Sequence, residues 1–186
     1  MPHSSLPRVR ESSVVLRERH GPGYRWRVLV TVMIGNVASI MSSTIVNVAL
    51  PDMSRVFLLG QDRAQWLSAG FMAAMTISML ATPWLLERLG YRSAYMAVIA
   101  LLMAGGIGGG LGWSFEWVLA MRVAEGLAAG LLQPIPTIII MNAFASHEQV
   151  RAMSLFSMGV VLAPAVGPGI GGVLVDLFGW RSIFYF

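Results

Sequence analysis

The stretch VVLAPAVGPGIGGVLVDLFGW, residues 160–180, places glycine and proline among branched apolar residues and contains one charged side chain. Small residues recur every four positions from the residue just before this stretch, at Gly159, Ala163, Gly167 and Gly171. In a helix this spacing builds a narrow ridge along one face, which lets a second helix approach closely inside a membrane. The stretch therefore predicts a membrane helix with a close helical partner.

Two prolines, Pro164 and Pro168, stand in the same stretch four residues apart. Each lacks an amide hydrogen, so each removes one internal helix hydrogen bond and favours a bend. We expect a helix that is thin enough for close contact and bent enough for that contact to rearrange. Ordinary packing explains the same residues, because glycine and proline are common in membrane helices.

The whole chain is too apolar for a water-soluble protein. Of its 186 residues, 56% are hydrophobic and 12% are charged, whereas soluble domains carry about 25% charged residues. There is no cysteine, which excludes disulfides, thiolate metal sites and thiol nucleophiles, and no metal site is predicted. The net charge of +4 comes from arginines in short segments between apolar runs, which indicates membrane topology rather than a nucleic-acid partner.

Five apolar segments are long enough to cross a bilayer, which takes roughly 20 helical residues. Their short connections predict antiparallel neighbours whose backbone polar groups are satisfied within each helix. The predicted fold class is an all-α integral membrane protein with five complete spans and the start of a sixth. The spans are expected at residues 28–50, 66–86, 95–111, 117–141 and 153–175, and the truncated sixth at 183–186.

Arginine counts place the N-terminus in the cytoplasm. Nine arginines lie in residues 1–27 and the loops on the same side, three lie on the other side, and Arg122 lies within a span. We expect residues 1–27 to form a cytoplasmic tail and residues 28–186 a partial transmembrane bundle. Arginine without lysine is typical of a GC-rich bacterial genome, which predicts a bacterial cytoplasmic (inner) membrane. A cleaved signal peptide fits less well, because the apolar run is long and more spans follow.

The first span has one polar face. Its opposite face carries Ile34, Val37, Met41, Ile45 and Val48, which we expect to meet lipid. Interhelical hydrogen bonds and the wall of a polar cavity both explain the polar face, and both interpretations stay open. The candidate cavity-lining residues are Asn36, Ser39, Ser42, Ser43 and Asn47, with Gln133 in the fourth span.

Arg122 and Glu125 are three residues apart in the fourth span and so share a helix face. A charge near the bilayer centre costs about 2.5–3.5 kcal/mol on insertion scales, which predicts a functional role. A purely structural ion pair, or an Arg122 side chain that reaches the outer surface, is the alternative. Ser42 and Glu125 each lie eight residues from the outer end of their spans. Both are therefore about 12 Å deep and are expected to line one chamber.

Four motifs together resemble the major facilitator superfamily, specifically the N-terminal part of its drug:proton antiporter branch with fourteen spans. STIVNVALPDM at 43–53 resembles the end of the first span of that branch, and RVAEGLAAGLLQP at 122–134 resembles the motif R-x-x-Q-G. PWLLERLGYR at 83–92 resembles the loop motif G-x-L-x-D-R-x-G-R-R. The resemblance covers about residues 26–186. The fifth-span antiporter signature G-x-x-x-G-P-x-x-G-G is matched around Gly159, Pro164, Gly167, Pro168, Gly171 and Gly172.

This resemblance implies a transporter that exchanges protons for organic cations, lipophilic drugs or related compounds. Family members rock two helical bundles about a midplane site. The implied partners are therefore the lipid bilayer, a small-molecule substrate and the missing C-terminal bundle, with the proton gradient as energy source and no cofactor. The loop motif implies a cytoplasmic gate at Glu87, Arg88, Gly90 and Arg92, whereas a tight hairpin with Gly90 as C-cap is the alternative.

Two departures from the family pattern concern carboxylates. Ser42 stands where the branch normally has aspartate, and Glu125 replaces the glutamine of R-x-x-Q-G. We infer that the titratable group has moved to the fourth span and faces the same chamber. Burial there opposes ionisation of the carboxyl whereas Arg122 favours it, so Arg122 and Glu125 form the predicted proton-coupling pair.

Other functions remain as alternatives. The chain is interpreted as the N-terminal fragment of a longer efflux transporter, with a substrate-importing symporter or a truncated, non-transporting membrane scaffold as alternatives. An enzyme is not expected, because the inner side offers only Glu87, His147 and Glu148, and no catalytic motif appears. Capping of a helix by Ser146 is the simpler explanation for the loop that contains His147 and Glu148.

Overall fold

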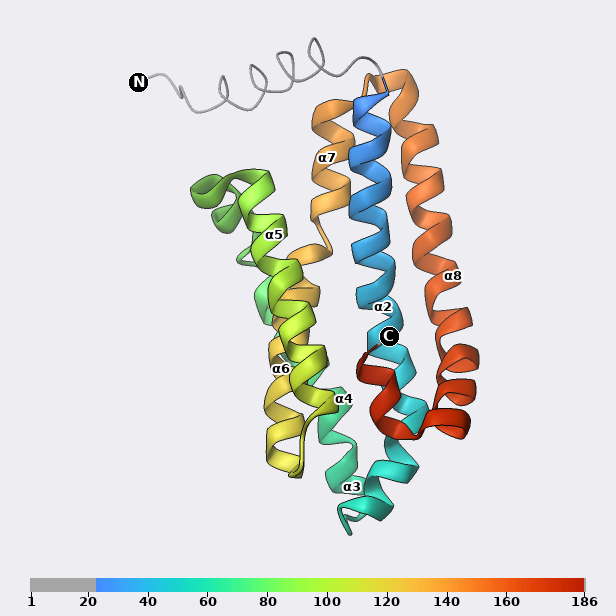
Figure 1. The fold of residues 1–186 in the computed structure, drawn as a ribbon. Coiled ribbons are helices and arrows are strands. Elements are labelled where there is room, and N and C mark those ends of the chain that lie inside the picture. The colour runs from blue at the N-terminus through green and yellow to red at the C-terminus, as the bar shows by residue number, and fades with distance from the viewer. Residues whose placement is uncertain (1–22, 186) are drawn as a thin grey trace.

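The computed structural model describes residues 23–185 as a bundle of helices (Figure 1). The predicted tail lies outside the described residues as far as residue 22, and the first described helix already begins within it. The all-helical architecture agrees with the prediction. The elements are α2 (Tyr24–Val56), α3 (Gln61–Ala64), α4 (Trp66–Met79), α5 (Thr82–Gly110), α6 (Phe115–Leu132), α7 (Ile135–Ala143), α8 (Ser146–Phe178) and the 3-10 helix η1 (Trp180–Phe184).

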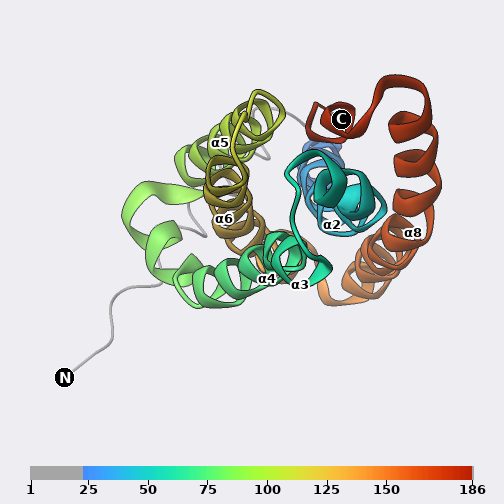
Figure 2. The ribbon, with the colours of Figure 1, turned by 90° about the horizontal axis from the view of Figure 1, so that it is seen from below.

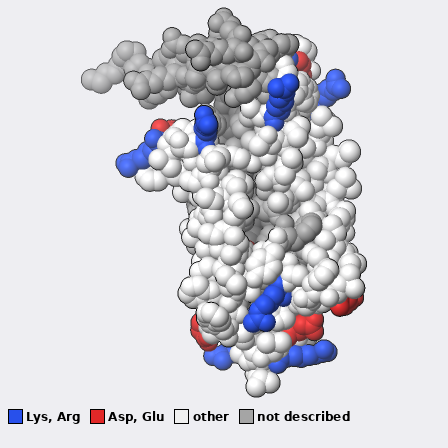
Figure 3. Space-filling view, in the orientation of Figure 1, with Lys and Arg blue, Asp and Glu red and all other residues white. Residues whose placement is uncertain are grey.

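Four segments of the described chain are long and apolar enough to cross a membrane. They are Arg25–Val56, Thr82–Gly110, Phe115–Ala143 and Ser146–Phe178, and they overlap the first, third, fourth and fifth predicted spans. Charged side chains gather at the two ends of the visible face, with an uncharged belt between them (Figure 3). This distribution fits helices that cross the apolar core of a bilayer.

The second predicted span, residues 66–86, is wrong as a single helix. α4 ends at Met79, a turn follows, and α5 begins at Thr82. Pro83 explains the break, because it has no amide hydrogen for the Met79 carbonyl and its ring would clash with that carbonyl in a continuous helix. α5 is itself interrupted at Gly90, where φ is 73° and ψ is 162°, a conformation that favours glycine.

The fourth predicted span consists of α6 and α7 with a short turn between them. Pro136 cannot donate to the carbonyl of Leu132, so a helix hydrogen bond is lost there. Asn36 Nδ2 donates to this carbonyl over 3.3 Å, and Thr82 Oγ1 donates to the neighbouring carbonyl of Leu131 over 3.3 Å. Side chains of α2 and α5 thus supply hydrogen bonds at the break in the span.

α2 lies between two groups of helices. α4, α5 and α6 pack together on one side of it, and α8 runs along the other side (Figure 2). The small-residue ridge (Gly159, Ala163, Gly167 and Gly171) faces α2, as the spacing predicts for a close helical partner.

The face of α2 that was expected to meet lipid is largely covered. Met41 and Ile45 are only 9% and 1% exposed, so this expectation is wrong for both. A Cβ atom at Gly171 would lie 2.5 Å from Cγ1 of Ile45, which shows how closely α8 covers this face. Ile34, in contrast, is 66% exposed and agrees with the prediction.

The end of α8 turns the chain back onto the bundle. Gly179 has φ 79° and ψ 169°, which allows a sharp change of direction before η1. Trp180, Ile183 and Phe184 of η1 are buried in one cluster with residues of α2, α4 and α6. η1 therefore lies against the lower half of the bundle, beside the end of α8 (Figure 1).

Candidate functional site

Arg122 and Glu125 form an ion pair inside the bundle, between Nη1 of the arginine and Oε2 of the glutamate. Their exposed fractions are 1% and 3%. Both project from α6, and their separation by three residues places them on one face, as expected from the sequence. Neither side chain reaches the outer surface, so the alternative of a surface-seeking Arg122 does not describe this structure.

Ser42 of α2 completes the charged centre, which we define as Ser42, Arg122 and Glu125. Arg122 donates from Nη1 to Ser42 Oγ over 3.0 Å and from Nη2 to the Ser42 carbonyl over 3.1 Å. The Phe71 ring of α4 lies 4.4 Å from the guanidinium carbon, within the range of a cation–π contact. Three helices therefore hold the arginine in one position.

A cavity of about 360 Å³ lies beside the charged centre, between α2, α5, α6 and η1. Ser42 and Glu125 both border it, as their equal predicted depths suggest. Glu125 is the charged residue of its lining, and the other lining side chains are mostly apolar. They are Gly35, Ala38, Ile45, Ile99, Leu102, Met103, Ile107, Ile183, Phe184 and Tyr185.

Two glycines of α5 allow this geometry. A Cβ atom at Gly105 would lie 2.6 Å from Cγ of Glu125, and one at Gly106 would lie 3.3 Å from its Oε1. Any larger residue at Gly105 would push α5 away from the carboxyl group. Sequence reasoning missed these positions, although the run MAGGIGGGLG at 103–112 is a visible indication of close helix packing.

The other predicted cavity-lining residues lie elsewhere. Asn36 and Ser39 are buried, with exposed fractions of 0% and 1%. Ser43 Oγ donates to the carbonyl of Ile40 in its own helix over 2.6 Å. Asn47 is exposed near α4, where its Oδ1 accepts from Ser68 Oγ over 2.7 Å. Gln133 is half-buried at the turn between α6 and α7. Their role in a cavity stays a prediction.

The predicted gate residues surround the break in α5 at one end of the bundle. Glu87, Arg88, Gly90 and Arg92 are all exposed, and Glu87 forms no ion pair with any residue in the described part of the chain. The guanidinium carbon of Arg88 lies 4.7 Å from the Trp84 ring. The gate and the hairpin interpretations are both compatible with this arrangement.

The antiporter-motif residues divide between two faces of α8. Gly159, Gly167 and Gly171 face α2, whereas Pro164 and Pro168 are exposed and α8 runs as one helix past both. A Cβ atom at Gly172 would meet nothing within 4 Å. The motif thus gives α8 one packed face and one face without a neighbour among the described helices.

A second polar contact joins α2 and α8 at their first turns. Arg25 Nη2 lies 2.5 Å from Glu148 Oε1, and the arginine also lies 5.3 Å from the Phe144 ring centroid. The proposed cap at Ser146 is wrong, because Ala145 is the N-cap and makes no side-chain cap hydrogen bond. Glu148 is thus a structural partner of Arg25 rather than part of an interfacial catalytic group.

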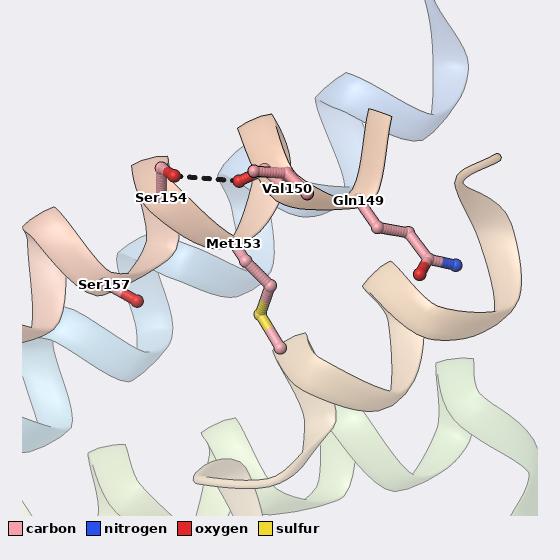
Figure 4. A pocket seen from close by; sticks show the side chains of 5 residues that line it. All are labelled: Gln149, Val150, Met153, Ser154 and Ser157. Atoms are coloured by element: carbon pink, nitrogen blue, oxygen red, sulfur yellow. Dashed lines mark hydrogen bonds between the residues drawn. The ribbon is translucent and has the colours of Figure 1, made fainter. Parts of the chain in front are cut away.

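A shallow hollow of about 500 Å³ lies along α8, and its lining side chains are neutral (Figure 4). Ser154 Oγ donates to the carbonyl of Val150 over 2.8 Å. Gln149 Nε2 donates to the carbonyls of Met141 and Phe144, which end α7. The polar groups of Gln149 and Ser154 are occupied by intramolecular bonds and the hollow has no charged lining residue, so the cavity beside Glu125 is the stronger candidate site.

Comparison with known families gives one match over most of the chain. A family model described as Major Facilitator Superfamily matches residues 32–186.

The chain also resembles curated bacterial proteins. It is 33% identical over 158 residues to the multidrug resistance protein Stp of Mycobacterium tuberculosis, covering 84% of this chain and 29% of the relative. Identity to the probable multidrug resistance protein EmrY of Escherichia coli is 28%, covering 87% of this chain and 32% of the relative. For the riboflavin transporter RibZ of Clostridioides difficile these values are 26%, 86% and 35%. The chain thus spans about a third of the length of each of these relatives.

Proposed function

The chain belongs to the Major Facilitator Superfamily, and from that premise we propose that it acts in proton-coupled efflux of small lipophilic or cationic compounds. The family consists of multi-pass membrane transporters rather than enzymes, which agrees with the prediction from the sequence. The observation that carries the proposal is the buried ion pair of Arg122 and Glu125 beside a cavity. Ionisable residues inside a membrane are costly and typically serve transport or proton transfer.

Glu125 is the proposed proton carrier. In its ionised form it accepts from Arg122, which in turn donates to two oxygens of Ser42 in α2. A proton on Glu125 cancels the negative charge of the pair and leaves Arg122 with Ser42 alone. Protonation therefore changes the bonding between α6 and α2, which is the kind of differential interaction that biases one conformation over another.

The direction of transport is proposed from the relatives and from the fifth-span motif. Stp and EmrY are named as multidrug resistance proteins, whereas RibZ is named as a riboflavin transporter. We infer that the protein exports its substrate and that a second, C-terminal bundle completes the transport site. Uptake is the competing outcome. The Gly159–Gly172 segment would carry the moving contact, and Glu87, Arg88, Gly90 and Arg92 would close the cytoplasmic side.

We also propose a bacterial inner-membrane location with the N-terminus in the cytoplasm. The segments around residues 24–28, 88–92 and 151 lie at one end of the bundle (Figure 1). Their arginines outnumber those at the other end when the predicted tail is included, and basic residues favour the cytoplasmic side. The relatives above are bacterial proteins.

The decisive variant is Glu125→Gln. Full-length protein in inverted membrane vesicles is expected to dissipate a preformed pH gradient when ethidium or another lipophilic compound is added. Glu125→Gln is expected to abolish this exchange while substrate binding and membrane insertion persist, because Arg122 keeps its two bonds to Ser42. Glu125→Asp, which keeps the carboxyl group, serves as the matched control.

Undiminished proton exchange by Glu125→Gln would rule out Glu125 as the proton carrier. Proton-driven accumulation of the added compound in right-side-out vesicles, instead of extrusion, would rule out efflux in favour of uptake.

A further inference from the structure

We propose that Phe71 of α4 is a positioning residue of the charged centre, and that its ring holds the Arg122 guanidinium in place while Glu125 carries a proton. The proposal rests on the assignment of Glu125 as the proton carrier. It adds a third helix, α4, to the contact between α2 and α6 that protonation changes.

The Phe71 ring and the guanidinium group of Arg122 are buried against each other. The guanidinium carbon lies over the ring, 4.4 Å from its centroid, and both residues are 1% exposed. An aromatic ring has a negative face, and its attraction for a cation grows when both groups are removed from water. The ring of Phe184 is a second aromatic neighbour, but its centroid is 6.0 Å from the same carbon, at the limit of such contacts. Phe71 therefore makes the stronger cation–π contact.

Close packing of α4 on α6 fixes the position of this ring. A Cβ atom at Gly126, the residue after Glu125, would lie 3.0 Å from the Phe71 Cα and closer still to its carbonyl oxygen. One turn further along α6, a Cβ atom at Gly130 would lie 2.8 Å from the carbonyl carbon of Met75. Two glycines of α6 thus bring the α4 backbone into direct contact. This contact fixes the point from which the Phe71 side chain reaches the guanidinium.

A proton on Glu125 would leave Arg122 as a buried cation. In the described part of the chain its ion pair is with Glu125, and its Nε is buried without a hydrogen-bond partner. Once the carboxyl group is neutral, the cation keeps the two oxygens of Ser42 and, at closest range, the face of the Phe71 ring. An uncompensated buried charge is costly, and the ring supplies part of the missing negative potential. Phe71 therefore acts most strongly in the protonated state, and it keeps the guanidinium where it can bind the carboxylate again.

The test must separate this attraction from ordinary packing. Phe71→Leu removes the ring but also leaves a cavity, which destabilises the protein by itself. Fluorine atoms on the ring withdraw electron density from its face and change its size little. Phenylalanines with one, two and three ring fluorines, incorporated at position 71 of the full-length protein by amber suppression, weaken the cation–π contact and preserve the packing.

The first measurement is the rate of ethidium-driven proton exchange in inverted vesicles, per amount of protein. The logarithm of the maximal rate is expected to fall in even steps along the series, to about fivefold below the wild type with three fluorines, because each step weakens the same attraction. The half-saturating ethidium concentration is expected to stay unchanged, since Phe71 is not among the described residues that line the cavity beside Glu125.

Phe144 provides the matched control. Its ring centroid lies 5.3 Å from the guanidinium carbon of Arg25, a contact of the same kind outside the charged centre. Phe144 is also buried, with an exposed fraction of 4%. The same fluorine series at position 144 is expected to leave the exchange rate unchanged. A flat rate across the series at Phe71, or an equal fall across the series at Phe144, would overturn the proposal.

The second measurement is the thermal midpoint of the detergent-extracted protein. Glu125→Gln reproduces the loss of negative charge that protonation causes, so the ring is then the main compensation for the cation besides Ser42. The fall in midpoint per fluorine at Phe71 is expected to be about twice as steep in the Glu125→Gln background as in the wild-type background. Equal slopes in the two backgrounds would show that the ring does not stand in for the carboxylate, and would overturn the proposal.

The two measurements separate the role of Phe71 from the proposed function. Abolished exchange in Glu125→Gln together with a flat rate along the Phe71 series would keep the proton carrier and overturn the positioning role. Undiminished exchange in Glu125→Gln would remove the proton carrier, and with it the role of Phe71 in transport, whatever the midpoints show. A steeper midpoint slope in that variant would then establish the contact as a stabilising one only.

Discussion

α2 contacts α8 and α6 in opposite ways. Toward α8 the contact is made by the small-residue ridge, where backbone and apolar side chains meet directly. Toward α6 the contact is made by the charged centre, in which Arg122 donates to both oxygens of Ser42. Lipid is as apolar as the helix surfaces, so membrane helices associate through close packing or through polar bonds. Close packing dominates the α8 side, which has the Arg25–Glu148 pair only at its end, whereas the α6 side holds the buried carboxyl group that we propose as the proton carrier.

The largest expected loss of stability comes from removing the positive charge of Arg122 from the charged centre. Arg122→Gln leaves Glu125 buried without the charged partner that it has in this structure. Breaking a buried pair in this way costs about 3–5 kcal/mol. We expect a severe loss of folded protein, measured as the thermal midpoint of detergent-extracted protein by fluorescence-detected size exclusion.

The double variant Arg122→Gln/Glu125→Gln removes both charges and is expected to recover most of that stability. A single Arg122→Gln variant as stable as the wild type would show that the α2–α6 contact does not depend on charge.

A smaller loss of stability is expected when a side chain is added at a glycine of the small-residue ridge. Gly171→Val places a side chain within 2.5 Å of Cγ1 of Ile45, so α8 must move away from α2. Overpacking of this kind costs about 1–3 kcal/mol. Gly172→Val is the control, since a Cβ atom there meets nothing within 4 Å and the cost in helix propensity is the same.

The thermal midpoint of Gly171→Val is expected to fall clearly below that of Gly172→Val. Equal midpoints would mean that the ridge is not a close contact in the membrane, and the contrast between the two sides of α2 would disappear.

The fold could be predicted from the sequence where the evidence is local. Glycine spacing and the i, i+3 separation of Arg122 and Glu125 depend on a single helix, and both correspond to features of the structure. Span length was sufficient for four of the five complete spans, which overlap long apolar segments. The break after Met79 was also accessible, because Pro83 is visible in the sequence and its effect on the carbonyl four residues earlier is general. The prediction of a single span at residues 66–86 underestimated that effect.

The partners of each helix could not be predicted in the same way. A helical wheel separates the polar and apolar faces of α2, but it does not show that the apolar face meets α8 rather than lipid, which is why Ile45 was misplaced. The role of Asn36 also depends on another helix, because its side chain donates a hydrogen bond to the Leu132 carbonyl, which lacks a helix partner in α6. The contact of Phe184 with the glycines of α5 likewise depends on a turn at Gly179 whose direction the sequence leaves open.

The smallest expected effect on stability concerns the ion pair between α2 and α8. Arg25 and Glu148 lie at the end of that contact with side chains 16% and 24% exposed, so solvent partly screens them. Arg25→Gln is expected to lower stability by about 0.5–1 kcal/mol, as for partly exposed pairs. A double-mutant cycle with Glu148→Gln measures the coupling, and the pair of Asp52 and Arg55, at 3.6 Å and far more exposed, should give none. A coupling as large as that of Arg122 and Glu125 would mean that charge also holds α8 to α2. A small coupling keeps that side dependent on packing and leaves the α6 side as the contact that a proton can change.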